Sequence, residues 1–271
     1  MPFKTIDFSK HSSIKIGPST EVFVLEDKVY PTDHYILGQC NNVLIGSNPP
    51  PLMILGKNYD YIQIEENFLC VGAATPGGKI LSFCKKHDIA HFELLPKLPG
   101  NLGGMIKMNA GLKDYEIFNY LHSIVTEKGE ILKKDIPHGY RWTDFDGIVF
   151  EARFEIHKGF REEDVEMFKK MRDNQPLDPS AGSCFKNPKG DAAGRLIQEV
   201  GLKGHRIGGI AFSEKHANFL VNLENGSFEE AIDLIRLAQN RVFEKFGIWL
   251  ENEVIIVDKD YMHEDSPLIK R

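Results

Sequence analysis

The stretch that most constrains this chain is Leu98–Gly111, which reads Leu-Pro-Gly-Asn-Leu-Gly-Gly-Met-Ile-Lys-Met-Asn-Ala-Gly. One proline and four glycines lie among apolar residues there, which indicates a tight backbone path inside a packed setting. Glycine permits positive φ angles and close approach to a ligand, and exposed N–H groups can line a concavity for anions. Asn101, Lys107 and Asn109 add hydrogen-bonding groups, so the stretch is typical of a ligand cradle. A turn between two core elements is the alternative, and composition does not identify the ligand.

Composition and charge exclude several classes of protein. The 271 residues suffice for one large domain or two to three small ones. The formal charge of −6 gives no general attraction to nucleic acid or to an acidic membrane surface. The four cysteines show no C-x-x-C spacing, so neither a disulfide framework nor a metal site is expected. The first ten residues lack the apolar core of a signal peptide, and no stretch has the roughly 20 apolar residues of a membrane span. We therefore expect a cytoplasmic protein.

Short helices and strands follow one another without a regular βαβ alternation, so we expect an α+β fold. Apolar periodicity predicts helices at 77–87, 161–174 and 192–200, and a fourth that begins with a capping box at Ser227 and ends at Gly247. Strands are predicted at 21–25, 43–45, 52–55, 61–64, 68–72, 121–126, 131–133, 147–156, 207–212, 218–222 and 253–257.

The turn Gly46-Ser47-Asn48 follows one of these short strands. A turn exposes successive N–H groups, and its serine and asparagine add side-chain donors, so this turn is a candidate anion site. A surface turn stiffened by the three prolines at 49–51 is the alternative. The chain has neither a G-x-G-x-x-G after a strand nor a G-x-x-x-x-G-K-[ST], so it carries no Rossmann or P-loop fingerprint.

Three further stretches carry candidate functional groups. Arg141 lies between Tyr140 and Trp142 and is either a stacked surface residue or a fixed cation with a rigid fork. Ser183 is not in a G-x-S-x-G elbow and has no basic partner in sequence, so it is interpreted as a turn hydroxyl and its neighbour Cys184 as a small buried residue. The basic cluster beginning at Lys203 fits either a phosphate site or a solvated loop.

Five motifs in register give the chain a family resemblance. They are Leu98–Gly104 followed by Met108–Gly111, then Gly139–Arg141, Gly182–Pro188, Gly201–Gly204 and Leu250–Val254. With these motifs the chain resembles the UDP-N-acetylenolpyruvoylglucosamine reductases, the MurB family of flavoenzymes in peptidoglycan precursor synthesis, over nearly its whole length.

The resemblance implies an α+β fold with a two-part FAD-binding region of the MurB/vanillyl-alcohol-oxidase type and a C-terminal α+β substrate domain. The expected domains are 1–56 (FAD-binding subdomain 1, with the C-terminal strand returning to it), 57–174 (FAD-binding subdomain 2) and 175–271 (substrate-binding). The chain departs from the family in a shortened glycine run before Ser47, in Thr143 at a serine position and in Asp146 at a lysine position. A short stretch between Phe154 and Gln175 places the chain in the compact subclass.

The resemblance also implies cofactors and residue roles. FAD is expected to bind non-covalently and NADPH to donate the hydride, with no metal involved. The residues expected to hold the cofactor are Gly46, Ser47, Asn48, Pro99, Gly100, Asn101, Gly103, Gly104, Asn109 and Ala110. The substrate, UDP-N-acetylglucosamine enolpyruvate, is expected to contact Tyr140, Lys186, Asn187 and Lys203. Neither nucleic acid nor a membrane is an expected partner, and the sequence does not give the oligomeric state.

The expected catalytic residues are Arg141, Glu253 and Ser183. Reduction of an enolpyruvyl group places negative charge next to a carboxylate, which needs a nearby cation or acidic donor in a dry site. Arg141 suits this role as a permanent cation, and Glu253 would serve as a protonated donor, which burial favours. Ser183 corresponds to the general acid of the family. Another FAD-dependent oxidoreductase of the same architecture, or a flavin-binding module without activity, remains the alternative.

Overall fold

The computed structural model describes residues 2–27 and 30–262, which divide into two compact units. The described residues of 1–4, 23–39 and 52–173 form the first unit, and those of 5–22, 40–51 and 174–271 form the second. Helices and sheets are mixed in both, so the expected α+β class is confirmed. The expected domains 1–56 and 175–271 include residues 1, 28–29 and 263–271, which lie outside the described part of the chain.

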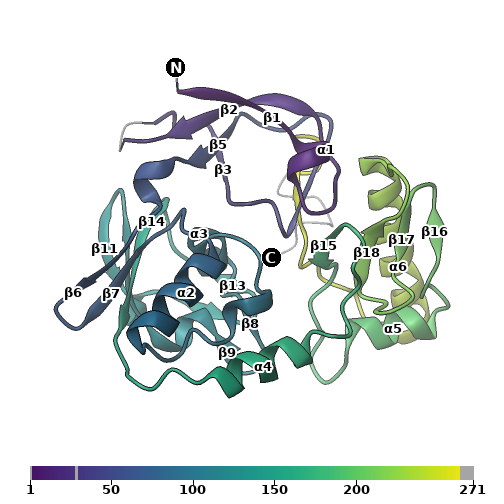
Figure 1. Cartoon of the computed structure of the whole chain (residues 1–271). Helices are drawn as coiled ribbons and strands as arrows, with labels where there is room; N and C mark the ends of the chain where they lie inside the picture. Colours follow the sequence, from purple (N-terminus) through teal and green to yellow (C-terminus); the bar gives the residue numbers. More distant parts are fainter. Residues whose placement is uncertain (1, 28–29, 263–271) are drawn as a thin grey trace. The chain divides into compact units, whose positions relative to one another are not determined.

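A five-stranded antiparallel sheet with the order β11-β10-β14-β7-β6 is the centre of the first unit (Figure 1). Its strands are β6 (Ile62–Glu65), β7 (Phe68–Gly72), β10 (Leu121–Thr126), β11 (Gly129–Leu132) and β14 (Val149–Glu155). The hairpin predicted over residues 61–72 is confirmed. The long strand predicted at 147–156 is also present as β14, and its first four residues are all buried, so its two faces are covered there.

Helices pack on one face of this sheet and form its hydrophobic core. They are α2 (Gly77–His87) and α3 (Leu102–Lys107), and α4 (Glu162–Met171) adds Phe168 to the same core. Helix α2 has the predicted bounds and ends because Asp88 takes a left-handed conformation with φ 55°. Helix α4 is shorter at both ends than the predicted range 161–174.

Two further groups of elements complete the first unit. A four-stranded sheet has the order β1-β2-β5-β3, with β1 (Phe3–Asp7), β2 (Ser19–Leu25), β3 (Tyr35–Leu37) and β5 (Leu52–Leu55). Strand β1 passes along the chain from the first unit into the second, and β2 passes from the second unit back into the first. Short hairpins and 3-10 turns connect the larger elements: β8 (Gly111–Leu112), β9 (Tyr115–Glu116), β12 (His138–Gly139), β13 (Trp142–Thr143), and turns at Lys57–Tyr59, Leu95–Lys97, Ile117–Tyr120 and Lys133–Asp135.

The second unit contains a sheet with the order β15-β18-β17-β16 and two helices packed on it (Figure 1). Its elements are β15 (Ser180–Ser183), α5 (Ala193–Glu199), β16 (Arg206–Ile207), β17 (Ile210–Phe212), β18 (Phe219–Asn222) and α6 (Phe228–Phe246). The predicted start and end of α6 are confirmed, because Ser227 and Glu230 form the reciprocal capping box and Gly247 has φ 67°.

Sequence periodicity is wrong at one strand of this sheet. The predicted strand 207–212 is a hairpin, β16 and β17, which pair through Arg206↔Ala211 and Ile207↔Ile210. The chain reverses at Gly208, whose φ is 53°, and at Gly209, where a Cβ would approach the backbone of Gly226 at 2.5 Å. An apolar run with a Gly-Gly pair inside it thus folds as two short strands.

The remaining elements of the second unit are the short helix α1 (Phe8–His11) and a parallel strand pair, β4 (Val43–Ile45) and β19 (Ile255–Val257). The last strand therefore pairs with a strand from the N-terminal part of the chain. It begins two residues later than the predicted 253–257, so Glu253 precedes it. Within residues 2–27 and 30–262, none of the helices combines the length and the apolar character that a membrane crossing needs.

Candidate active site

The residues expected to act divide between the two units, so each group is described by itself. The first unit holds Pro99, Gly100, Asn101, Gly103, Gly104, Asn109, Ala110, Tyr140 and Arg141. The second unit holds Gly46, Ser47, Asn48, Ser183, Lys186, Asn187, Lys203 and Glu253.

The glycine-rich stretch of the first unit begins a helix rather than a loop. Asn101 is the N-cap of α3, and its side-chain oxygen accepts a hydrogen bond from the amide of Gly104 at 3.3 Å. The amides of Leu102 and Gly103 donate to the carbonyl oxygens of Thr75 and Ala73 at 3.0 and 2.8 Å. Three amides expected to face an anion are thus bound to protein acceptors. What the stretch presents instead is the exposed backbone of Gly104.

Asn109 is fully buried and uses its side chain within the protein. Its Nδ2 donates to Glu116 Oε2 at 2.7 Å and to the carbonyl oxygen of Gly139 at 3.0 Å. Its Oδ1 accepts from the amide of Phe118 at 3.3 Å. Asn109 therefore ties together two hairpins, β8-β9 and β12-β13, and Ala110 beside it belongs to the hydrophobic core.

Arg141 is a fixed cation in this structure. It occupies the tip of the β12-β13 hairpin, and its side chain is only 12% exposed. Its Nη2 donates to the carbonyl oxygen of Gly111 at 2.7 Å, and its Nη1 lies 4.0 Å from Glu116 Oε1. The guanidinium also stacks on the ring of Tyr140, with 4.9 Å between Cζ and the ring centroid. Carbonyl oxygens, a carboxylate and a ring thus orient the fork, as the fixed-cation interpretation requires.

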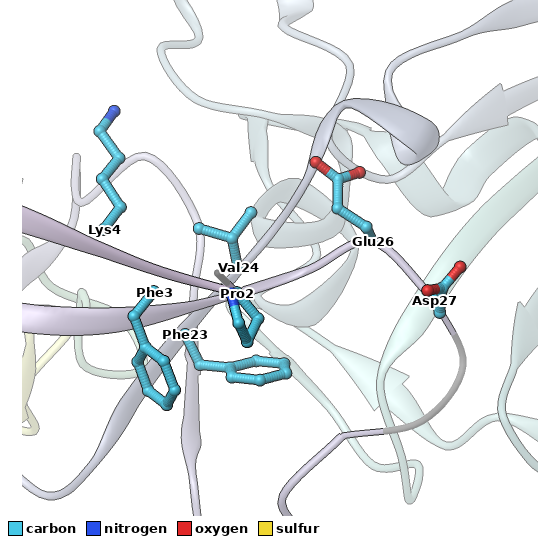
Figure 2. A pocket seen from close by; sticks show the side chains of 7 residues that line it. All are labelled: Pro2, Phe3, Lys4, Phe23, Val24, Glu26 and Asp27. Carbon is cyan, nitrogen blue, oxygen red and sulfur yellow. The ribbon is translucent and has the colours of Figure 1, made fainter.

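A hollow beside β1 and β2 contains none of the expected site residues (Figure 2). The rings of Phe3 and Phe23 meet edge to face there, with 5.4 Å between their centroids. Its acidic residues, Glu26 and Asp27, make it unsuited to a phosphate-bearing ligand. The hollow is lined by Pro2, Phe3, Lys4, Phe23, Val24, Glu26 and Asp27.

The turn after β4, in the second unit, binds an anion from its own chain. The amide of Asn48 donates to Asp258 Oδ2 at 2.9 Å, and the amide of Gly46 donates to the carbonyl oxygen of Val257 at 3.1 Å. A Cβ at Gly46 would collide with the Asp258 carboxylate, so the glycine is required there. Ser47, at the tip of the turn, is exposed. A buried carboxylate therefore occupies the concave side of this short turn.

The chain from Ser183 to Lys186 runs antiparallel to the chain from Glu251 to Val254. The carbonyl oxygen of Cys184 accepts from the amides of Glu253 and Val254 at 2.9 and 3.2 Å, and a bridge joins the next pair of residues. Cys184 is buried as interpreted, and this burial raises the pKa of its thiol well above the ordinary value. The structure thus brings Ser183 and Glu253, which are 70 residues apart in sequence, onto neighbouring segments.

Ser183 is at the end of β15 and is partly exposed. Among the described residues its hydroxyl has no hydrogen-bond partner, whereas the hydroxyl of Ser180, in the same strand, accepts from the amide of Gly182 at 3.1 Å. The hydroxyl of Ser183 is therefore not needed to hold this strand together.

Lys186 is bound to the carboxylate of Glu251, with 2.5 Å between Nζ and Oε1. This ion pair distinguishes Glu251 from the nearby Glu253. Glu251 is paired with a lysine and is exposed, while Glu253 is half-buried and its amide donates to the carbonyl oxygen of Cys184. Lys186 therefore pairs with Glu251 and not with Glu253, although both glutamates lie on the segment that is paired with its own.

Asn187 and Lys203 lie at the two ends of α5. The Asn187 side-chain oxygen accepts from the amide of Ala193 at 3.0 Å, so it satisfies one free amide at the helix N-terminus. Lys203 follows the helix and is exposed. The pKa of His216 is lowered mainly by the burial of its ring, and the positive charge of Lys203 lowers it further. In the same basic cluster Arg206 is paired with Glu224 at 2.5 Å, whereas Lys203 forms no ion pair within residues 2–27 and 30–262.

Curated relatives of known name align with almost the whole chain. It is 47% identical over 255 residues to the UDP-N-acetylenolpyruvoylglucosamine reductase of Helicobacter pylori strain J99, covering 93% of this chain and 98% of that protein. It is 48% identical over 257 residues to the reductase of the same name from Campylobacter jejuni strain RM1221, covering 93% and 99%. The chain belongs to the UDP-N-acetylenolpyruvoylglucosamine reductase family.

Two further comparisons agree with this assignment. The family model for the C-terminal domain of UDP-N-acetylenolpyruvoylglucosamine reductase, MurB_C, matches residues 174–257. The crystal structure of MurB from Thermus caldophilus matches with a TM-score of 0.84 and 27% identity, covering 94% of this chain and 98% of that one. The MurB fold expected from the resemblance is confirmed, and the family is one of oxidoreductases.

Two acidic residues near the expected site residues were not predicted from the sequence. Asp258 fills the turn after β4, and Glu116 joins Asn109 to Arg141. Asp258 gave a weak signal, as an acidic residue directly after an apolar strand. Glu116 gave none, because its partners are brought to it by two hairpins of the fold.

Proposed function

We propose that this chain reduces UDP-N-acetylglucosamine enolpyruvate to UDP-N-acetylmuramate, with NADPH as the hydride donor and bound FAD as the carrier. The proposed setting is the cytoplasm, where the product serves peptidoglycan precursor synthesis. The observation that carries the proposal is 47% identity, over 93% of the chain, to a reductase of that name. The fixed guanidinium of Arg141 supports it as well, because the reaction needs a permanent cation at a carboxylate.

The residues expected to hold FAD fit it through close backbone approach more than through many donors. Gly104 and Ser47 are exposed, and in the described part of the chain a Cβ at Gly104 would meet the Asn101 side chain at 3.3 Å and no other neighbour outside helix α3 within 4 Å. A glycine surface of this kind lets a flat or phosphate-bearing group approach the main chain. We propose that Pro99–Gly104, Asn109–Ala110 and Gly46–Asn48 form the FAD-binding surfaces, within domains 1–56 and 57–174. Bound FAD supplies a two-electron carrier that takes hydride from NADPH and passes it to the substrate.

The chain's own residues bind the substrate and move its proton. Arg141 accepts the carboxylate on its fork, and a protonated Glu253 donates a hydrogen bond to the same group. Hydride addition to the terminal vinyl carbon leaves an electron pair on the neighbouring carbon, to which Ser183 Oγ delivers its proton. Tyr140, Lys186, Asn187 and Lys203 are proposed to contact the sugar nucleotide, with residues 175–271 as the substrate domain.

Substrate-dependent oxidation of NADPH tests the function. The purified protein, supplied with NADPH and the enolpyruvyl sugar nucleotide, is expected to consume both in equal amounts. The product is expected to be heavier than the substrate by the mass of two hydrogens. NADPH consumption that is independent of the sugar nucleotide, or its absence with a full complement of FAD, would contradict the proposal.

The flavin is expected to be held without a covalent bond. Acid precipitation of the purified protein should therefore release free FAD into the supernatant, which absorbance and chromatography would identify. Flavin that stays with the precipitated chain would contradict this expectation and would favour an oxidase with an attached cofactor.

Substitutions at the two glutamates test the assignment of Glu253. Glu253→Gln keeps a hydrogen-bond donor, so we expect it to retain part of the activity, whereas Glu253→Ala should lose much more. Glu251→Ala is the matched control, because Glu251 pairs with Lys186 and is exposed. It should leave kcat nearly unchanged. Steady-state kinetics on the three variants measure this, and a larger loss in Glu251→Ala would exchange the two roles.

A further inference from the structure

We propose that Glu116 is a positioning residue for Arg141, and that together with Asn109 it sets the orientation of the guanidinium. The inference rests on the proposed function, in which Arg141 binds the substrate carboxylate. It goes beyond it by assigning a task to a glutamate that does not itself touch the substrate.

Glu116 lies next to the guanidinium of Arg141 and contacts groups from both hairpins. Glu116 belongs to β9, and its two carboxylate oxygens face different partners: Oε2 accepts from Asn109 Nδ2 at 2.7 Å, and Oε1 lies 4.0 Å from Arg141 Nη1. Asn109 in turn donates to the carbonyl oxygen of Gly139, which is two residues before Arg141. The carboxylate therefore contacts both the cation and the residue that holds the cation's hairpin.

Burial strengthens the interaction between Glu116 and Arg141. The side chains of Glu116 and Arg141 are 20% and 12% exposed, so solvent screens their interaction less than at an open surface. The carbonyl oxygen of Gly111 accepts from Nη2 at 2.7 Å, and it also lies in the hairpin that carries Glu116. Both contacts come from the β8-β9 hairpin, so this hairpin fixes the orientation of the guanidinium before a ligand binds.

The backbone around the network is strained in the same places. Asn109 and Arg141 have φ angles of 45° and 63°, a region that non-glycine residues seldom adopt. Such residues persist where their surroundings over-determine them, and they occur at ligand clamps. Gly111 is also needed here, because a Cβ on it would collide with the Tyr115 carbonyl and approach Glu116 Cα at 2.8 Å. The residues with positive φ angles and the closely packed glycine thus all belong to the network that contacts the guanidinium.

The conservative and truncating variants separate charge from contact. Glu116→Gln can still accept from Asn109 but loses its charge beside Arg141, and Glu116→Ala loses both. We expect kcat/KM for the enolpyruvyl substrate to fall about threefold in the first and about tenfold in the second, the range of coupling between residues in contact. In an Arg141→Lys background, Glu116→Ala should add less than about twofold, because the group that it positions is already altered.

A readout on the side chain itself separates this inference from the proposed function. Nitrogen NMR of the Arg141 guanidinium should show slow rotation about its Nε–Cζ bond in the wild-type protein and faster rotation in Glu116→Ala. Asp114→Asn, which removes an exposed carboxylate from the same hairpin, is the control and should change neither rotation nor kinetics. Flavin content and thermal unfolding of all variants exclude general damage.

Three results would overturn the proposal. The first is guanidinium rotation in Glu116→Ala that equals the wild type. The second is a loss from Glu116→Ala that is as large in the Arg141→Lys background as alone, which would mean a separate structural role. The third is a Glu116→Gln enzyme as fast as the wild type or faster, since the carboxylate would then only weaken the charge of Arg141. Failure of the proposed function would appear differently, as a wild-type protein without turnover but with a slowly rotating guanidinium.

Discussion

Ser183→Ala is expected to leave flavin reduction by NADPH intact and to slow reoxidation by the enolpyruvyl substrate by at least about 10²–10⁴-fold, the range attributed to general acid catalysis. The hydroxyl delivers its proton only when the substrate is reduced, so the first half-reaction does not use it. The structure supports a clean experiment, because among the described residues no hydrogen bond depends on this hydroxyl. Rapid mixing under anaerobic conditions, with flavin absorbance as the signal, measures both half-reactions.

Ser180→Ala is the matched control for this change. It removes a hydroxyl from the same strand, and that hydroxyl accepts from the amide of Gly182, so a purely structural effect would appear there first. We expect both half-reactions of Ser180→Ala to stay close to the wild type. Equal damage to both half-reactions in Ser183→Ala would show that Ser183 has a structural role.

Arg141→Lys is expected to lower turnover with the enolpyruvyl substrate by at least about tenfold, which corresponds to about 1.4 kcal/mol of transition-state stabilisation. Lysine keeps the charge but has no planar fork, so it cannot be held by the Gly111 carbonyl oxygen and face a carboxylate with two parallel donors. Steady-state kinetics measure the loss. FAD content should stay near normal, because Arg141 serves the substrate.

Arg195→Lys is the control for the chemical change itself. Arg195 is an exposed residue of α5 that pairs with Asp191, so losing its fork should not alter turnover. Arg141→Lys protein that lacks flavin would show that Arg141 serves the cofactor. Activity within twofold of the wild type would show that Arg141 is a stacked surface residue without a role in the reaction.

Local patterns predicted the elements whose signals lie within a few neighbouring residues. The capping box at Ser227 and the left-handed Gly247 fix both ends of α6, and both are visible in the sequence. The same holds for α2, whose apolar face and terminal residues need no distant partner. Local chemistry determines such elements, which is why their bounds were predicted within a residue.

The glycine-rich stretches were harder to interpret, because distant acceptors decide what their amides do. The amides of α3 bind carbonyl oxygens that the chain supplies from residues 73 and 75. The Gly46–Asn48 turn binds a carboxylate more than 200 residues further along, at Asp258. A glycine run indicates that something approaches the backbone closely, but not whether it is a ligand or the protein itself.

For the site, the sequence identified the residue types, and folding gave them their partners. The fixed state of Arg141 depends on Glu116 and on the Gly111 carbonyl oxygen, which the β8-β9 hairpin provides. The distinction between Glu251 and Glu253 depends on Lys186, which lies 65 residues earlier in the chain. Neither partner follows from spacing. Lys186 meets Glu251 through backbone pairing between separate segments, and Glu116 meets Arg141 through side chains of two separate hairpins.

Reduction and reoxidation of the flavin in one anaerobic experiment test the central claim most directly. The protein is first mixed with one equivalent of NADPH, and the flavin absorbance is expected to bleach. Addition of UDP-N-acetylglucosamine enolpyruvate is then expected to restore the absorbance fully, with one equivalent of UDP-N-acetylmuramate formed. Absorbance that remains bleached after the sugar nucleotide is added, and returns only when oxygen is admitted, would contradict the account.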